Sequence, residues 1–139
     1  RIINELIDEY ANKNKNIRAY TSLGMVKYLS ALKYCSVVIG NSSSGLLEAP
    51  SFGIPTVNIG DRQKGRIQSS SVINCEPLQD SIKQAIDLAV STEFRDKAKK
   101  AINPYGSGNT SERVIDVVKD FILNGKINLK KIFYDYEVN

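Results

Sequence analysis

Histidine is missing from the 139-residue sequence altogether. Without an imidazole, this chain alone can build neither a serine–histidine triad nor a histidine-ligated metal site. The two cysteines, Cys35 and Cys75, lack the C-x-x-C spacing that is typical of zinc sites. We therefore expect no metal and no cofactor, and any catalytic histidine must come from another part of the protein or from a partner.

Long apolar runs are also missing. None approaches the roughly 18 residues that a membrane-spanning helix needs, and the first six residues lack the basic-then-apolar layout of a signal peptide. They are typical of the middle of a helix instead. We therefore expect a piece of a longer, cytoplasmic protein that does not bind a membrane.

Basic residues show no concentration along the chain. Nineteen Lys and Arg against fifteen Asp and Glu give a formal charge of +4, and the basic residues are adjacent only at Lys99-Lys100 and Lys130-Lys131. A nucleic-acid-binding protein gathers its basic residues in a stripe with aromatic side chains for stacking. The sequence therefore predicts no nucleic-acid partner.

Helical patterns alternate with short apolar runs. Apolar residues at helical spacing predict helices near 2–11, 25–35, 46–52, 78–90, 92–102 and 109–123, the last one capped by Asn109 with Glu112. β-branched or alternating runs predict strands at 17–21, 36–40, 56–60 and 72–75. This alternation predicts an α/β fold, a Rossmann-like parallel sheet with helices on both faces. Ligands of such sheets bind in the loops beyond the carboxyl ends of the strands.

Three hydroxyls and a glycine follow the predicted strand 36–40. Ser42, Ser43 and Ser44 can donate hydrogen bonds, Gly45 permits close approach of the backbone, and a helix start offers unpaired N–H groups. This pattern predicts a phosphate site, although one serine capping the helix explains it equally well.

Charged residues flank that turn. Glu48 lies one helical turn further on, where a carboxylate can accept hydrogen bonds from a vicinal diol or simply complement the helix start. Arg62 and Arg66, with Lys64 between them, follow the strand 56–60. They can clamp a pyrophosphate through paired N–H groups or form an ordinary exposed basic loop.

Residues 40–63 resemble the central signature of the UDP-N-acetylglucosamine 2-epimerase family, and the segments at 20–32 and 103–106 fit it as well. The resemblance is to the hydrolysing branch, which is typified by the forms G-N-S-S-S-G and N-I-G-D-R-Q-x-G-R. It implies a GT-B architecture of two Rossmann-like domains. In that architecture residues 1–125 form the nucleotide-binding C-terminal domain, residues 126–139 form a tail, and the N-terminal catalytic domain is absent.

The resemblance also implies roles for individual residues. Ser42 and Ser43 contact the diphosphate beside Gly45, Glu48 binds the ribose, and Arg62 lies at the same site. The backbone around Ser22 and Leu23 lines the uracil. No catalytic residue lies in this chain, because the acid–base carboxylates and the family's histidine lie upstream.

The implied reaction eliminates UDP from UDP-N-acetylglucosamine and hydrates the resulting glycal to N-acetylmannosamine, a precursor of sialic acids. UDP or a UDP-sugar is then the ligand, and we expect a homo-oligomer that is inactive as this fragment alone. Three alternatives stay open: a 2-epimerase acting on a UDP-linked diacetamido-trideoxyhexose of the legionaminic acid pathway, the nucleotide domain of a GT-B glycosyltransferase, and a non-catalytic UDP-sugar binding module.

Overall fold

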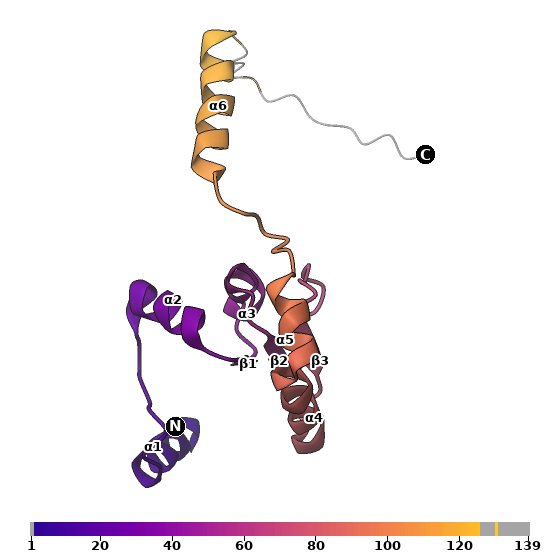
Figure 1. The fold of residues 1–139 in the computed structure, drawn as a ribbon. Helices are drawn as coiled ribbons and strands as arrows, with labels where there is room; N and C mark the ends of the chain where they lie inside the picture. Colours follow the sequence, from indigo (N-terminus) through magenta and orange to yellow (C-terminus); the bar gives the residue numbers. More distant parts are fainter. Residues whose placement is uncertain (1, 126–129, 131–139) are drawn as a thin grey trace. The chain divides into compact units, whose positions relative to one another are not determined.

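The computed structural model describes residues 2–125 and 130, which form two compact units (Figure 1). The first unit spans residues 1–105 and the second residues 106–139. Apart from Lys130, the predicted tail 126–139 lies outside the described residues.

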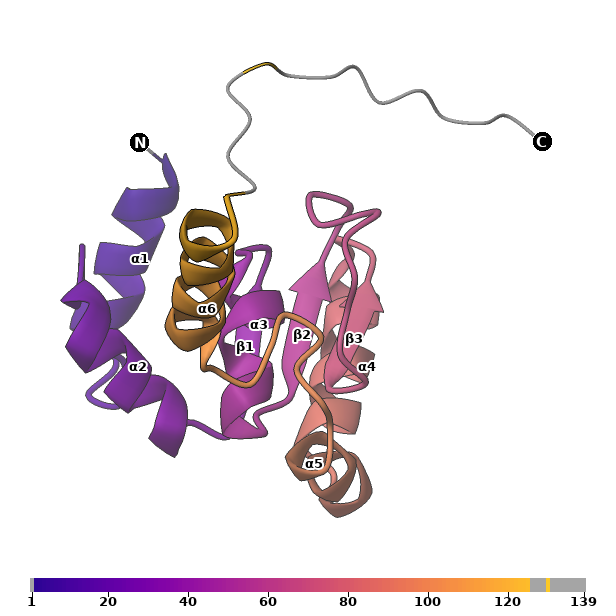
Figure 2. The same ribbon diagram turned by 90° about the horizontal axis from the view of Figure 1, so that it is seen from above.

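A three-stranded parallel sheet forms the centre of the first unit. Its strands are β1 (Val38–Gly40), β2 (Thr56–Ile59) and β3 (Val72–Cys75), in the order β1-β2-β3. Each strand pairs in parallel with its neighbour, and Figure 2 shows them side by side. Three of the predicted strands and the parallel sheet are therefore confirmed.

Helices cover both faces of this sheet, as predicted. Helix α3 (Ser44–Leu47) lies against one face, where Thr56 Oγ1 donates a hydrogen bond to the Gly45 carbonyl at 3.0 Å. On the other face, Val57 packs against Ala85 and Ala89 of helix α4 (Gln79–Val90). Thr56 and Val57 are consecutive, so their side chains point to opposite faces of β2.

The remaining helices of the first unit begin and end close to their predicted positions. They are α1 (Ile2–Lys13), α2 (Gly24–Tyr34), the 3₁₀ helix η1 (Ala49–Phe52) and α5 (Thr92–Lys99). The Ser91 hydroxyl caps α5 by accepting a hydrogen bond from Phe94 N at 3.2 Å. The part of the chain that the structure describes contains no helix long and apolar enough to cross a membrane.

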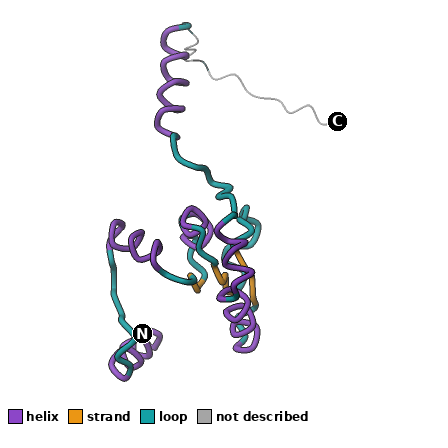
Figure 3. The backbone as a smooth tube through the Cα atoms, in the orientation of Figure 1, coloured by secondary structure: helices purple, strands orange, loops and turns teal. Residues whose placement is uncertain are grey.

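The predicted strand at 17–21 is wrong: this segment runs as a loop between α1 and α2 (Figure 3). Its alternating side chains have the right period, but a strand also needs a backbone partner and a buried face. Ile17 and Tyr20 are exposed, and the backbone N–H of Ile17 bonds to Asn14 of the preceding turn. Within the described residues, β1 therefore pairs only with β2.

The second unit contains α6 (Thr110–Leu123), which begins where the sequence predicts. The predicted cap is wrong, because the Asn109 side chain makes no capping bond. Asn109 has a φ of 61°, in the left-handed region, whereas a capping side chain needs an extended backbone to reach the first-turn N–H groups.

Candidate functional site

The serine turn follows β1 directly and is fixed from two sides. Ser42 Oγ accepts a hydrogen bond from Ser44 N at 3.3 Å, which folds the turn on itself. The Ser44 hydroxyl is hydrogen-bonded to the hydroxyl of Tyr28, a residue of α2. Ser44 is therefore occupied inside the protein, and the hydroxyls of Ser42 and Ser43 are those left at the turn for a ligand.

The backbone N–H groups of this turn are largely satisfied already, in contrast to the expectation for a helix start. Gly45 N donates to Ser42 O at 3.3 Å and Leu46 N to Ser43 O at 2.9 Å. Because α3 has only four residues, its dipole is also short. A phosphate here would depend on hydroxyls and on basic side chains from elsewhere.

Gly45 has a packing role that the sequence did not reveal. The residue is buried, and a Cβ built on it would lie 2.5 Å from Thr56 Cγ2. Only glycine therefore lets α3 lie this close to β2. The predicted approach of its backbone to a phosphate stays a prediction.

The loop after β2 is tied to the serine turn at Asn41. Gln63, which is buried, donates from Nε2 to Asn41 O at 2.8 Å. Arg62 Nη1 reaches Asn41 O and Asn41 Oδ1, each at 3.5 Å. These bonds bring Arg62 beside Ser42, so the two loops predicted to share a site do meet.

The three basic residues of this loop lie in different places. Arg62 lies at the serine turn, whereas Lys64 lines a different pocket, described below. Arg66 is exposed. The expected basic clamp therefore reduces to Arg62.

Glu48 lies at the far end of α3, between that helix and η1. Its side chain is half-buried, and its Oε2 atom is buried without a hydrogen-bond partner. A buried carboxylate oxygen is costly to leave unpaired, which is consistent with an acceptor that a ligand completes.

Hydrogen bonds from Asn103 and Tyr105, which sequence reasoning missed, stabilise the segment around Glu48 and the loop after Arg62. Asn103 Nδ2 donates to the Leu47 carbonyl at 2.8 Å and to Ser51 Oγ at 2.6 Å, on either side of Glu48. Tyr105 Oη donates to the Ile67 carbonyl at 2.9 Å, in the loop that follows Arg62. The family resemblance of segment 103–106 was the available signal, but it did not indicate which residues Asn103 and Tyr105 contact.

Ser22 and Leu23 line a separate pocket at the start of α2, together with Tyr20 and Tyr28. The Ser22 hydroxyl accepts a hydrogen bond from Gly24 N at 3.2 Å. Because Tyr28 also bonds to Ser44, this aromatic pocket is linked to the serine turn. The structure thus connects all the predicted loops, with Tyr28 as a link that the sequence did not single out.

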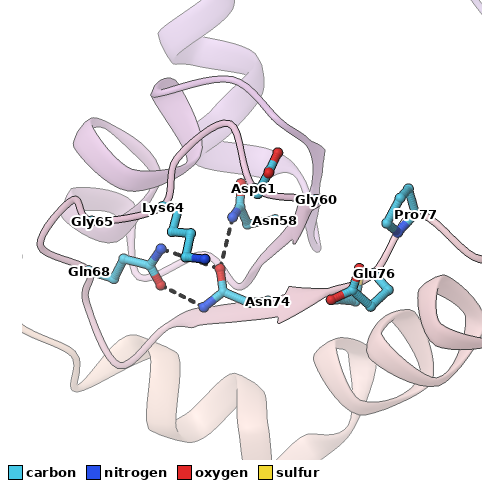
Figure 4. Close-up of a pocket in the computed structure, with 10 residues that line it drawn as sticks. Asn58, Gly60, Asp61, Lys64, Gly65, Gln68, Asn74, Glu76 and Pro77 are labelled. Carbon is cyan, nitrogen blue, oxygen red and sulfur yellow. Dashed lines mark hydrogen bonds between the residues drawn. The ribbon is translucent and has the colours of Figure 1, made fainter.

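A second pocket, of about 730 Å³, opens beyond the ends of β2 and β3. Asn58, Gln68 and Asn74 form a hydrogen-bonded row of carboxamides in its wall (Figure 4). Of the residues that the sequence predicts at the nucleotide site, only Lys64 of the basic loop lines it. Asn58 opens the N-I-G-D-R-Q-x-G-R form, but the sequence alone does not show that its side chain joins those of Gln68 and Asn74.

The two thiols are poor nucleophiles at neutral pH. Burial raises the pKa of Cys35, and burial together with the Glu76 carboxylate raises the pKa of Cys75. Neither thiol therefore forms a thiolate readily. Within the described residues, no three Cys, Asp or Glu side chains gather as a metal site would require.

Comparison with known proteins finds a matching family and several similar proteins. The family model for UDP-N-acetylglucosamine 2-epimerase matches residues 1–119. The chain is 37% identical to polysialic acid biosynthesis protein P7 of Escherichia coli over 127 residues, covering 91% of this chain and 32% of that protein. It is 42% identical over 95 residues to the hydrolysing GDP/UDP-N,N'-diacetylbacillosamine 2-epimerase of Campylobacter jejuni, covering 68% of this chain and 24% of that protein.

A solved structure shares the fold. The crystal structure of a UDP-N-acetylglucosamine 2-epimerase superposes with a TM-score of 0.73 and 17% identity, over 97% of this chain and 37% of its own. The present chain spans about a third of the length of the curated relatives over which it matches most fully.

Proposed function

The chain belongs to the UDP-N-acetylglucosamine 2-epimerase family, and from this premise we propose that it binds the UDP part of a UDP-linked N-acylated sugar. The whole protein would be a hydrolysing 2-epimerase. Its similarity to a hydrolysing 2-epimerase and to a polysialic acid biosynthesis protein supports both the branch and a place in the synthesis of sialic acid-type sugars.

One observation carries this proposal: the serine turn and Arg62 meet at the adjoining ends of β1 and β2. The Ser42 and Ser43 hydroxyls can donate to phosphate oxygens, and the guanidinium adds positive charge and paired N–H groups. Since the N–H groups of Ser44, Gly45 and Leu46 are bonded internally, Arg62 would provide most of the positive charge for a diphosphate.

The nucleoside would lie on the other side of the turn. The pocket at Ser22 and Leu23 contains Tyr20 and Tyr28, whose rings suit a planar base. Glu48 would accept hydrogen bonds from the ribose hydroxyls through its unpartnered carboxylate oxygen. Ribose recognition by an acidic residue is common in Rossmann-type folds.

In the proposed reaction, the bond between C1 of the sugar and the UDP oxygen breaks while C2 loses its proton, leaving a 2-acylamino glycal. Water then adds across the double bond, giving the C2 epimer as a free sugar. The part of this chain is to hold UDP and to stabilise the negative charge that develops on it as it leaves. The proton transfers fall to groups outside this chain.

We expect the 139-residue chain to bind UDP and to release none from UDP-N-acetylglucosamine. The proposed nucleotide groups are present, but the chain contains no histidine, and the proton transfers are proposed to fall to groups outside it. Isothermal titration calorimetry measures the binding, and a coupled assay measures free UDP. Release of UDP by this chain alone would contradict the assignment of the proton transfers to groups elsewhere.

Glu48→Gln should weaken UDP binding roughly tenfold, because losing charge from a hydrogen-bond acceptor costs about 1.5 kcal/mol. The sharper readout compares UDP with 2′-deoxy-UDP. The unchanged chain should prefer UDP, whereas the glutamine variant should bind both with similar affinity. An intact preference for UDP in the variant, with a lower melting temperature, would make Glu48 a structural charge only.

A further inference from the structure

The carboxamide-lined pocket beyond β2 and β3 has no part in the nucleotide site described above. Asn58 of β2 donates from Nδ2 to Asn74 Oδ1 of β3 at 2.8 Å. Asn74 in turn donates from Nδ2 to Gln68 Oε1 at 2.8 Å and accepts from Gln68 Nε2 at 3.3 Å. Figure 4 shows these three side chains joined in one wall of the pocket. We call it the amide pocket.

One polar group in this wall is incomplete. Asn58 is only 2% exposed, and its Oδ1 atom is buried with no hydrogen-bond partner, although the residue lines the pocket. Its neighbour Asn74 contacts Asn58 through an acceptor, because Asn74 Oδ1 receives the Asn58 Nδ2 bond and the bond that Asn74 donates goes to Gln68 Oε1. A buried acceptor of this kind is normally paired in a functioning protein, and a ligand with an N–H or O–H group would pair it.

The charges of the amide pocket favour a neutral ligand. Among the described residues that line it, Lys64 is the one cationic residue, against the carboxylates of Asp61 and Glu76. The described lining residues include no aromatic side chain, in contrast to the pocket at Tyr20 and Tyr28. A second anion or a stacked base is therefore disfavoured, whereas hydroxyl and amide groups find both donors and acceptors.

The position of the pocket relative to the nucleotide site follows from the order of the strands. The aromatic pocket includes Ile39 of β1, the serine turn follows β1, Arg62 follows β2, and the amide pocket lies over the ends of β2 and β3. Neighbouring strands are about 4.8 Å apart. A ligand with its base in the aromatic pocket and its diphosphate at Arg62 would therefore place its next group one strand further along, over the amide pocket.

We propose that the amide pocket binds the N-acylated sugar of the UDP-linked substrate, an inference that rests on the proposed function. The carboxamides of Gln68 and Asn74 bind the hydroxyl and N-acyl groups of the sugar, and Asn58 Oδ1 accepts from one of them. This chain then supplies sugar recognition as well as nucleotide binding.

The experiment compares UDP with UDP-N-acetylglucosamine as ligands of the same chain by calorimetry. The unchanged chain binds UDP-N-acetylglucosamine about tenfold more tightly than UDP. Asn74→Ala and Gln68→Ala each remove most of this difference and leave the affinity for UDP within twofold. Gln79→Ala is the matched control, since Gln79 is an exposed amide of α4 that does not line the pocket.

Two results overturn the inference while leaving the proposed function intact: equal affinity of the unchanged chain for both ligands, or a difference that persists in both alanine variants. Absence of UDP binding overturns the proposed function instead. The pocket is then titrated with free N-acetylglucosamine, following the side-chain amide NMR signals of Asn58, Gln68 and Asn74. Shifts of these signals support sugar binding in the amide pocket, and unchanged signals overturn this proposal.

Discussion

Gly45→Ala should lower the free energy of unfolding by about 3 kcal/mol, at the upper end of the cost of overpacking. The added Cβ would lie 2.5 Å from Thr56 Cγ2, well inside contact distance. Thr56 cannot easily turn away. It is 2% exposed, its β-branched side chain is stiff, and its Oγ1 is bonded to the Gly45 carbonyl at 3.0 Å. Urea unfolding of the two proteins measures the loss.

The background variant Thr56→Ser makes this prediction specific. Serine keeps the hydroxyl bond to Gly45 O but lacks the methyl group that the new Cβ would strike. In a Thr56→Ser background, Gly45→Ala should therefore cost about 1 kcal/mol, the loss caused by the crowding that remains. An equal cost in both backgrounds would show that contact with Thr56 does not explain the glycine.

The same pair of variants separates packing from ligand binding at Gly45. If the glycine backbone also approaches a phosphate, the folded double variant should bind UDP less tightly than Thr56→Ser alone. If its role is packing only, the two affinities should agree. The sequence suggested only the approach to a phosphate, because the packing contact with Thr56 depends on how α3 lies across the sheet.

The sheet was predictable because its strands carry their signal locally. The β-branched residues Val37, Val38 and Ile39 favour a strand, and the structure confirms parallel pairing there, although the Ile39 side chain is exposed. The segment 17–21 alternates as a strand with one buried face would, yet it forms no strand. Its period of two specifies which side chains share a face, but the sequence does not say whether a neighbouring strand is available to pair with it.

The candidate site was predictable only where residues lie in one contiguous motif. Ser42, Ser43 and Glu48 lie within one short segment, so their spacing suggests a common ligand. Tyr28, Asn103 and the carboxamides of the amide pocket depend instead on contacts between separate elements or loops, which the sequence does not show. An asparagine such as Asn74 is unremarkable until Asn58 and Gln68 are found beside it.

Arg62→Ala should weaken UDP binding about 100-fold. Loss of charge-assisted hydrogen bonds from a guanidinium to a diphosphate costs about 3 kcal/mol, near the upper end of the range for charged groups. The loss should be specific to the ligand, because the bonds of Arg62 to Asn41 are long, at 3.5 Å each. Gln63 continues to hold the loop to Asn41 at 2.8 Å, so circular dichroism and the unfolding midpoint should stay unchanged.

Uridine, Arg62→Lys and Arg95→Ala complete this test of Arg62. Uridine lacks the diphosphate, so its affinity should be the same for the unchanged chain and for Arg62→Ala. Lysine keeps the charge but loses the planar pair of N–H groups, and Arg62→Lys should therefore recover about tenfold of the lost affinity. Arg95→Ala removes an equal charge from an exposed position on α5 and should leave UDP binding within twofold. If Arg62→Ala and Arg95→Ala weakened UDP binding equally, Arg62 would act only through the net charge of the protein, and the diphosphate would depend on the serine hydroxyls.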